Sequence, residues 1–123
     1  MKVINEDPTY DRVNVNVRRS IDMAVERLVA RLSPYVDQNI EIGRVFADDI
    51  LIHNIINKYF YVYKCRVNQM QIRILYTIRD GDLIIMSHWY KNRTNNDYIK
   101  YFIDITTPYR NSIQQQIATT VGG

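Results

Sequence analysis

The most constraining feature of the sequence is an Asp80-Gly81 pair between two runs of alternating apolar residues. A two-residue type I′ turn requires a positive φ at both central positions, which Asp and Gly tolerate. The pair therefore predicts a β-hairpin over residues 70–90, with Arg79 opposite Asp82. Counting outward from the turn sets the register, because a one-residue slip would move every side chain to the other face.

This register divides the hairpin into two faces, since side chains alternate along a strand. We expect the first face to be the core face, because it is almost wholly apolar. Its members include Ile72, Ile74, Tyr76, Leu83, Ile85 and Trp89. The second face is mixed in character. It pairs Thr77 with Ile84, Leu75 with Met86, Arg73 with His88, and Gln71 with Tyr90.

Two further segments extend the predicted sheet. Residues 61–67 are rich in aromatic and β-branched side chains, and an Asn68-Gln69 turn would place Tyr63 opposite Ile74. That turn is weaker than Asp-Gly, so residues 60–79 could instead form one long bent strand. Residues 97–105 also alternate, which indicates a fourth strand. One face would carry Ile99, Tyr101, Ile103 and Ile105, and the other Tyr98, Lys100, Phe102 and Asp104.

Two helices are predicted ahead of the sheet. Residues 17–32 have apolar side chains at helical spacing, with Asn16 as a possible N-cap and Ser33-Pro34 as the stop. A second helix is predicted from Asp48-Asp49 to Tyr59. The expected fold class is α+β, with two amphipathic helices packed on one face of a four-stranded antiparallel β-meander.

Length and composition favour one domain over residues 1–123, with a flexible N-terminal arm (about 1–11) and an uncharged C-terminal tail (about 111–123). The first residues lack an apolar signal region, and no run is long enough to span a membrane. The single cysteine, Cys65, forbids an internal disulfide. We therefore expect a cytoplasmic, reducing location and read Cys65 as a small core residue.

Enzymatic motifs are missing from the sequence. His53, His88 and Cys65 do not sit at metal-ligand spacing, and the glycines form no phosphate-binding loop. Asp48-Asp49 is better explained by the start of a helix than by paired catalytic carboxylates. We expect no enzymatic activity, no metal, no cofactor and no small-molecule substrate.

The second face carries the strongest functional signal, a group of basic and aromatic residues. Residues 59–123 hold eight Lys or Arg against four Asp or Glu, and Lys64 is expected opposite Arg73, a destabilising like-charge pair. Such a surface suits single-stranded nucleic acid or an acidic protein, although a solvated basic face is the simpler explanation. The candidate residues are Lys64, Arg66, Arg73, His88, Tyr90, Tyr98 and Lys100.

An apolar zone is expected at the other end of the second face. An exposed patch of this kind usually marks a protein interface, unless a terminal segment of the same chain covers it. Its members are Val62, Leu75, Ile84, Met86 and Phe102. We therefore expect a non-enzymatic interaction module, a small subunit of a larger assembly such as a virus particle, built from copies of itself or other chains. The alternative is a nucleic-acid-binding protein.

Overall fold

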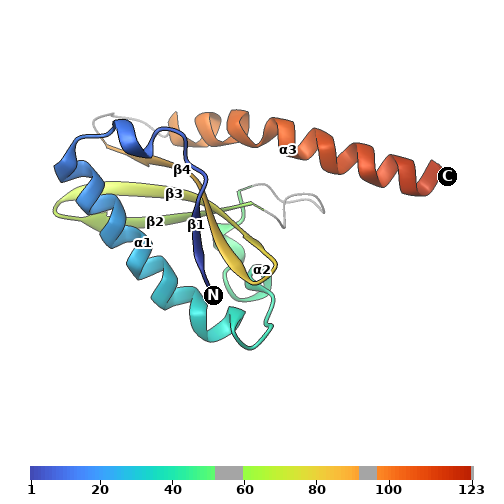
Figure 1. The fold of residues 1–123 in the computed structure, drawn as a ribbon, viewed down its shortest axis with the longest axis horizontal. Helices are drawn as coiled ribbons and strands as arrows, with labels where there is room; N and C mark the ends of the chain where they lie inside the picture. The colour runs from blue at the N-terminus through green and yellow to red at the C-terminus, as the bar shows by residue number, and fades with distance from the viewer. Residues whose placement is uncertain (52–59, 92–96, 123) are drawn as a thin grey trace.

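A computed structural model describes residues 1–51, 60–91 and 97–122, and it confirms the α+β class (Figure 1). Helical segments precede and follow the three consecutive strands of a four-stranded sheet, whose remaining strand is N-terminal. The elements in order are β1 (Val3–Asn5), η1 (Tyr10–Arg12), α1 (Val15–Val36), α2 (Ile42–Val45), η2 (Ala47–Asp49), β2 (Tyr61–Val67), β3 (Met70–Arg79), β4 (Asp82–Tyr90) and α3 (Asp97–Gly122).

The two predicted hairpins are confirmed. β2 pairs with β3 in the predicted register, with Tyr63 opposite Ile74 and Lys64 opposite Arg73. Both turns use the left-handed backbone region: φ is 51° at Asn68 and 66° at Gln69, and both Asp80 and Gly81 also have positive φ. The chain therefore turns twice through two-residue loops of the kind that match strand twist.

The predicted all-antiparallel meander is wrong, because the fourth strand comes from the other end of the chain. The sheet order is β1-β4-β3-β2, and β1 runs parallel to β4 with Val3 opposite Leu83 and Asn5 opposite Ile85. Residues 1–11, expected as a flexible arm, thus contribute β1 and the short helix η1. The result is a mixed sheet.

Residues 97–105, predicted as a strand, form the first part of helix α3. Their sequence satisfies two periods at once. Tyr98, Phe102 and Ile105 also recur at the three- and four-residue steps of a helix face. The helix is favoured because this spacing places Tyr98 and Phe102 against the second face of the sheet, where both are buried. Residues 111–122, expected as a tail, continue this helix.

α1 confirms the predicted helix over residues 17–32 and extends it at both ends. The N-cap is Asn14 rather than Asn16, and its side chain accepts a hydrogen bond from the Asn16 amide at 2.8 Å. Pro34 does not stop the helix, which continues to Val36. Proline removes only one amide donor there, close enough to the end for the last turn to form, with Asp37 N donating to Ser33 O.

The predicted second helix lies largely outside the described residues, so Ile55, Ile56 and His53 receive no structural account. The described part of that region differs from the prediction. Asp48 and Asp49 end the short helix η2, and Ile50 forms an isolated bridge to Tyr61 at the edge of the sheet.

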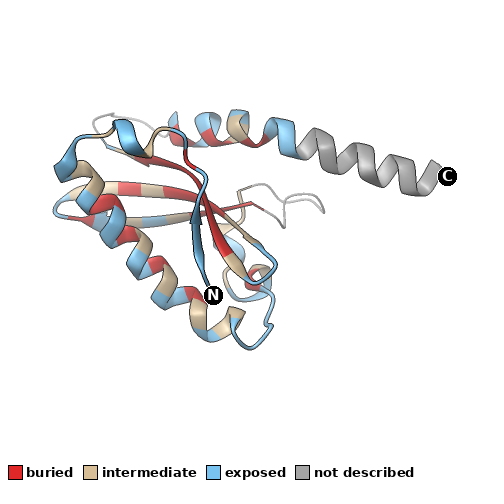
Figure 2. Ribbon diagram, viewed as in Figure 1, coloured by how far each residue is buried: buried red, intermediate tan, exposed pale blue. Residues whose placement is uncertain are grey.

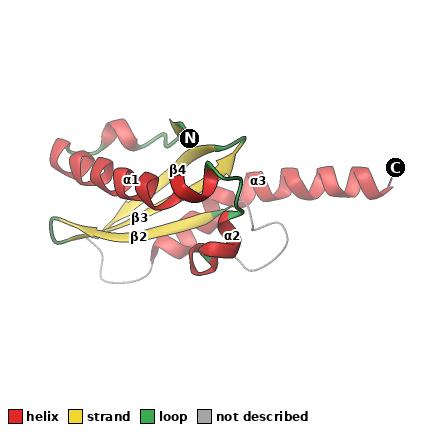
Figure 3. Cartoon of the chain, turned by 90° about the horizontal axis from the view of Figure 1, so that it is seen from below, coloured by secondary structure: helices red, strands yellow, loops and turns green. Residues whose placement is uncertain are grey.

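The described helices cover opposite faces of the sheet, whereas both predicted helices were expected on one face. α1 packs on the first face of the sheet (Figures 2 and 3). Leu28 and Leu32 of this helix join Ile72, Ile74 and Tyr76 in a fully buried core. The first part of α3 closes the second face. In the parts of the chain placed by the structure, no helix has the length and apolar character needed to cross a membrane.

Candidate functional site

The predicted protein interface is a second hydrophobic core within the chain. The α3 residues Tyr98 and Phe102 pack against the strands here, and Phe102 is 0% exposed. The open apolar patch expected from sequence is therefore covered by the C-terminal segment, the alternative considered for it. The interface candidates found in this core are Val62, Leu75, Ile84, Met86 and Phe102.

A β-bulge in the central hairpin reverses the predicted faces of the last residues of β4. The register follows the prediction as far as Tyr76 opposite Ile85, and then shifts by one residue. Arg73 is consequently opposite Trp89 rather than His88. An extra residue on one strand exchanges the faces of everything beyond it. His88 and Tyr90 therefore lie on the first face, and Trp89 lies on the second.

The bulge divides the predicted basic and aromatic cluster. Lys64, Arg66 and Arg73 keep their predicted pairings on β2 and β3, and Lys64 and Arg66 are exposed. Tyr98 is buried, with its ring 5.3 Å from the guanidinium carbon of Arg73. Lys100 is exposed on α3. The structure therefore joins Lys64, Arg73 and Tyr98, but it separates His88 and Tyr90 from them.

An acidic group near Lys64 was missed by the sequence analysis. Asp49 lies 3.6 Å from Arg31 and accepts a hydrogen bond from the Tyr76 hydroxyl at 3.2 Å. Burial raises the pKa of Asp49, although Arg31, Tyr76 and Lys64 each act in the opposite direction. Burial and the nearby Asp49 also raise the pKa of the Tyr76 hydroxyl. Lys64 thus has a carboxylate in its surroundings, which weakens the argument that its charge needs an external anion.

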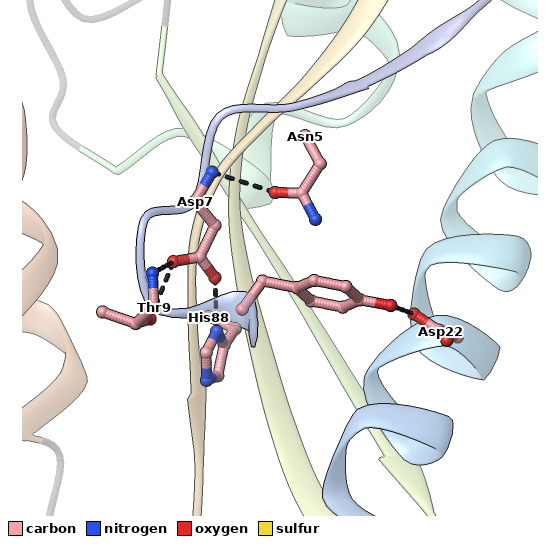
Figure 4. A network of polar contacts seen from close by, with 6 residues as sticks. Asn5, Asp7, Thr9, Asp22 and His88 are labelled. Atoms are coloured by element: carbon pink, nitrogen blue, oxygen red, sulfur yellow. Dashed lines mark hydrogen bonds and ion pairs between the residues drawn. The ribbon is translucent and has the colours of Figure 1, made fainter. Parts of the chain in front are cut away.

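The most developed polar site joins the N-terminal segment to β4, and Figure 4 shows its geometry. Nδ1 of His88 contacts Oδ2 of Asp7, and both side chains are buried. The other carboxylate oxygen of Asp7 accepts hydrogen bonds from the Thr9 amide at 2.9 Å and hydroxyl at 2.7 Å. Burial alone would raise the pKa of Asp7, but the hydrogen bonds from His88 and Thr9 outweigh it and lower the pKa.

A second contact ties the same segment to α1. The Tyr10 hydroxyl donates to Asp22 at 2.5 Å, and this bond raises the pKa of Tyr10 to about 12. Arg18 lies over the Tyr10 ring and donates to the backbone oxygen of Asp11. These contacts fix the N-terminal segment between sheet and helix. The arrangement therefore supports a structural role.

An open pocket of about 360 Å³ lies where the end of α1 and the start of α2 meet the β3–β4 turn. Glu41 is the only ionisable carboxylate among its lining residues, and its partner at 3.3 Å is Arg44. The walls are otherwise mixed, because Asn39 lies among apolar side chains. The lining residues include Val36, Ile40, Ile42, Tyr61 and Ile78.

Among the described residues, no three His, Cys, Asp or Glu side chains gather as a possible metal site. Cys65 is partly buried beside the first core, and burial raises the pKa of its thiol, which disfavours the reactive thiolate. Comparisons with protein-family models, with curated proteins and with solved structures gave no match to this chain.

Proposed function

We propose that the chain is a non-enzymatic interaction module, a small subunit of a larger protein assembly, and that α3 is its docking element. The supporting observation is that apolar residues occupy both sides of this helix. Tyr98 and Phe102 are buried against the sheet, whereas Ile99 is 40% and Tyr101 is 37% exposed. Exposed polar residues such as Lys100 and Asp104 form the outer face of this helix, so the exposed apolar side chains on its flanks offer a second contact surface.

The course of α3 gives further support. Figures 1 and 3 show the helix continuing beyond the sheet, and it reaches Gly122. Residues 111–123 contain no charged side chain. Most of the stability of helices in proteins comes from tertiary packing rather than from intrinsic propensity. Packing on neighbouring subunits, beginning with copies of this chain, would provide that stabilisation.

The nucleic-acid alternative has less support than assembly. Its basis was a row of cations interleaved with exposed rings, because bases stack on aromatic side chains. Tyr98 is buried, and His88 and Tyr90 lie on the opposite face from Lys64 and Arg73. Of the predicted nucleic-acid-binding residues, only the exposed cations remain available to contact a nucleic acid.

The test is the mass of the protein in solution, measured by sedimentation over a wide concentration range. We expect the wild type to form oligomers of its 14.7 kDa chain, and the double substitution Ile99→Ser with Tyr101→Ser to shift the mass toward the monomer. Met23→Ser is the matched control, because Met23 is a similarly exposed apolar residue on α1. It should leave the mass unchanged.

A second variant addresses the part of α3 beyond the sheet. A chain ending at Tyr109 should also be monomeric, with its single tryptophan still reporting the folded core. A wild type that stays monomeric at all concentrations, or a double variant that assembles as well as the wild type, would refute the proposed role of α3.

A further inference from the structure

The α3-facing side of the hairpin holds a group of buried polar atoms that have no partner. Arg73 Nε, Ser87 Oγ and Trp89 Nε1 make no hydrogen bond in the structure. Ser87 is 1% and Trp89 is 6% exposed. A buried donor without a partner is destabilising, and native proteins contain few of them. Three on one face therefore require an explanation.

These three residues are neighbours on the sheet. Arg73 is directly opposite Trp89, and Ser87 precedes Trp89 by two positions, which places it on the same face. Tyr98 of α3 contacts two members of the group: its ring is 5.5 Å from that of Trp89 and lies beneath the Arg73 guanidinium. Tyr98 belongs to the first turn of α3, where the helix dipole is positive and Asp97 adds a negative charge.

The guanidinium of Arg73 presents a free binding edge. Its Nη1 donates to the backbone oxygen of Ile72 at 3.1 Å, which leaves Nε, on the other edge, without an acceptor. Arg73 also has no carboxylate within ion-pair distance among the described residues. Lys64, directly opposite on β2, adds a second positive charge. A planar fork of this kind matches carboxylate or phosphate oxygens.

We propose that Arg73, Trp89 and Ser87 form a binding site for a small oxyanion, a carboxylate or a phosphate group. The indole and guanidinium groups can only donate, so the ligand must accept hydrogen bonds, and the positive charge of Arg73 selects an anion. A small cavity of about 100 Å³ is lined by Lys64 and Tyr98, the neighbours of Arg73 on β2 and α3. Asp48 and Asp49 also line this cavity, and Asp49 is already engaged by Arg31 and Tyr76.

The single tryptophan allows a direct test, because Trp89 gives the only indole N–H signal of the chain. The full-length protein is titrated with sodium phosphate, and separately with sodium acetate, at constant ionic strength maintained with sodium chloride. We expect a saturable shift of the indole N–H resonance and a matching change in Trp89 fluorescence. Response to phosphate alone identifies a phosphate site, and response to both identifies a general oxyanion site.

Variants separate this site from general charge effects. Arg73→Gln should abolish the saturable response, and Arg73→Lys, which keeps the charge but loses the fork, should weaken it at least tenfold. Arg66→Gln is the matched control, since Arg66 is an exposed cation of the neighbouring strand, and this variant should bind as the wild type does. If Arg73→Gln does not fold, Arg73→Lys decides. An equal response to chloride, or undiminished binding by Arg73→Lys, would overturn the proposal.

Discussion

Replacing Asp7 with Asn tests whether the buried Asp7–His88 contact holds the N-terminal segment on the sheet. The two residues are 81 positions apart in sequence, so their contact closes a long loop of chain. The substitution preserves the shape of the side chain and the acceptor oxygen that Thr9 uses. It removes the negative charge that His88 meets. The variant therefore isolates the charged part of the contact from its packing.

Hydrogen bonds to charged groups contribute about 1.5–3 kcal/mol each, and this one is buried at both ends. We expect Asp7→Asn to lose a similar amount of unfolding free energy at neutral pH, measured by urea denaturation with Trp89 fluorescence. Asp11→Asn is the matched control. Asp11 is exposed in the same segment, and its replacement should change stability by less than about 0.5 kcal/mol.

The effect of Asp7 on stability should also depend on pH in a defined direction. Its folded-state pKa lies below the usual value of 3.8, so its stabilisation is present above that value and is lost as pH falls through the lower folded pKa. The difference between wild type and Asp7→Asn should therefore shrink in acid. A difference that stays constant down to about pH 2, or a fully stable variant at pH 7, would refute this account of the contact.

Four further substitutions test the rest of the fold by urea denaturation in dilute solution. Phe102→Ala should cost about 3–5 kcal/mol if α3 closes a true core, whereas Ile99→Ala on its outer side should cost under about 1 kcal/mol; equal losses would contradict the assigned helix faces. Ile74→Ala should cost about 2–5 kcal/mol, and a loss below about 1 kcal/mol would mean the first face is misassigned. Gln69→Gly should stabilise by up to about 1 kcal/mol, because glycine relieves the positive φ there, and a destabilised variant would argue against this turn.

The hairpin registers were predictable because turn chemistry is local. Asp80-Gly81 suits a two-residue turn, and every pair counted outward from it is correct as far as Tyr76 opposite Ile85. The weaker Asn68-Gln69 turn also adopts positive φ at both positions. Local backbone preference and the alternation of the flanking strands agree at both turns, so neither depended on distant contacts.

The bulge could not be predicted, because the registers with and without it both place an aromatic residue of β4 on each face. In the predicted phase Trp89 belongs to the first face, and in the observed phase Tyr90 takes its place. Sequence alternation cannot separate these two arrangements. The choice depends on tertiary partners, since Trp89 meets Tyr98 from α3 and His88 meets Asp7 from the N-terminal segment.

The predicted structures of the two ends of the chain were wrong for different reasons. The segment at 97–105 fits both the strand period and the helix period. The helix is favoured only because its apolar residues bury the second face of the sheet. β1 has three residues, all exposed, too few for any periodic signal. Because its parallel pairing with β4 joins positions about 80 residues apart, no local pattern could identify it.

The candidate sites depend on the same contacts between distant parts of the chain. Had the hairpin kept its simple register, His88 would have lain opposite Arg73 beneath α3, and Asp7 would have lost its partner. The extra residue in β4 brings Trp89 opposite Arg73 instead, so the aromatic ring completes the second core while its indole N–H makes no hydrogen bond. The bulge thus links three features of the molecule: the attachment of the N-terminal segment, the docking of α3 and the donor group proposed to bind an oxyanion.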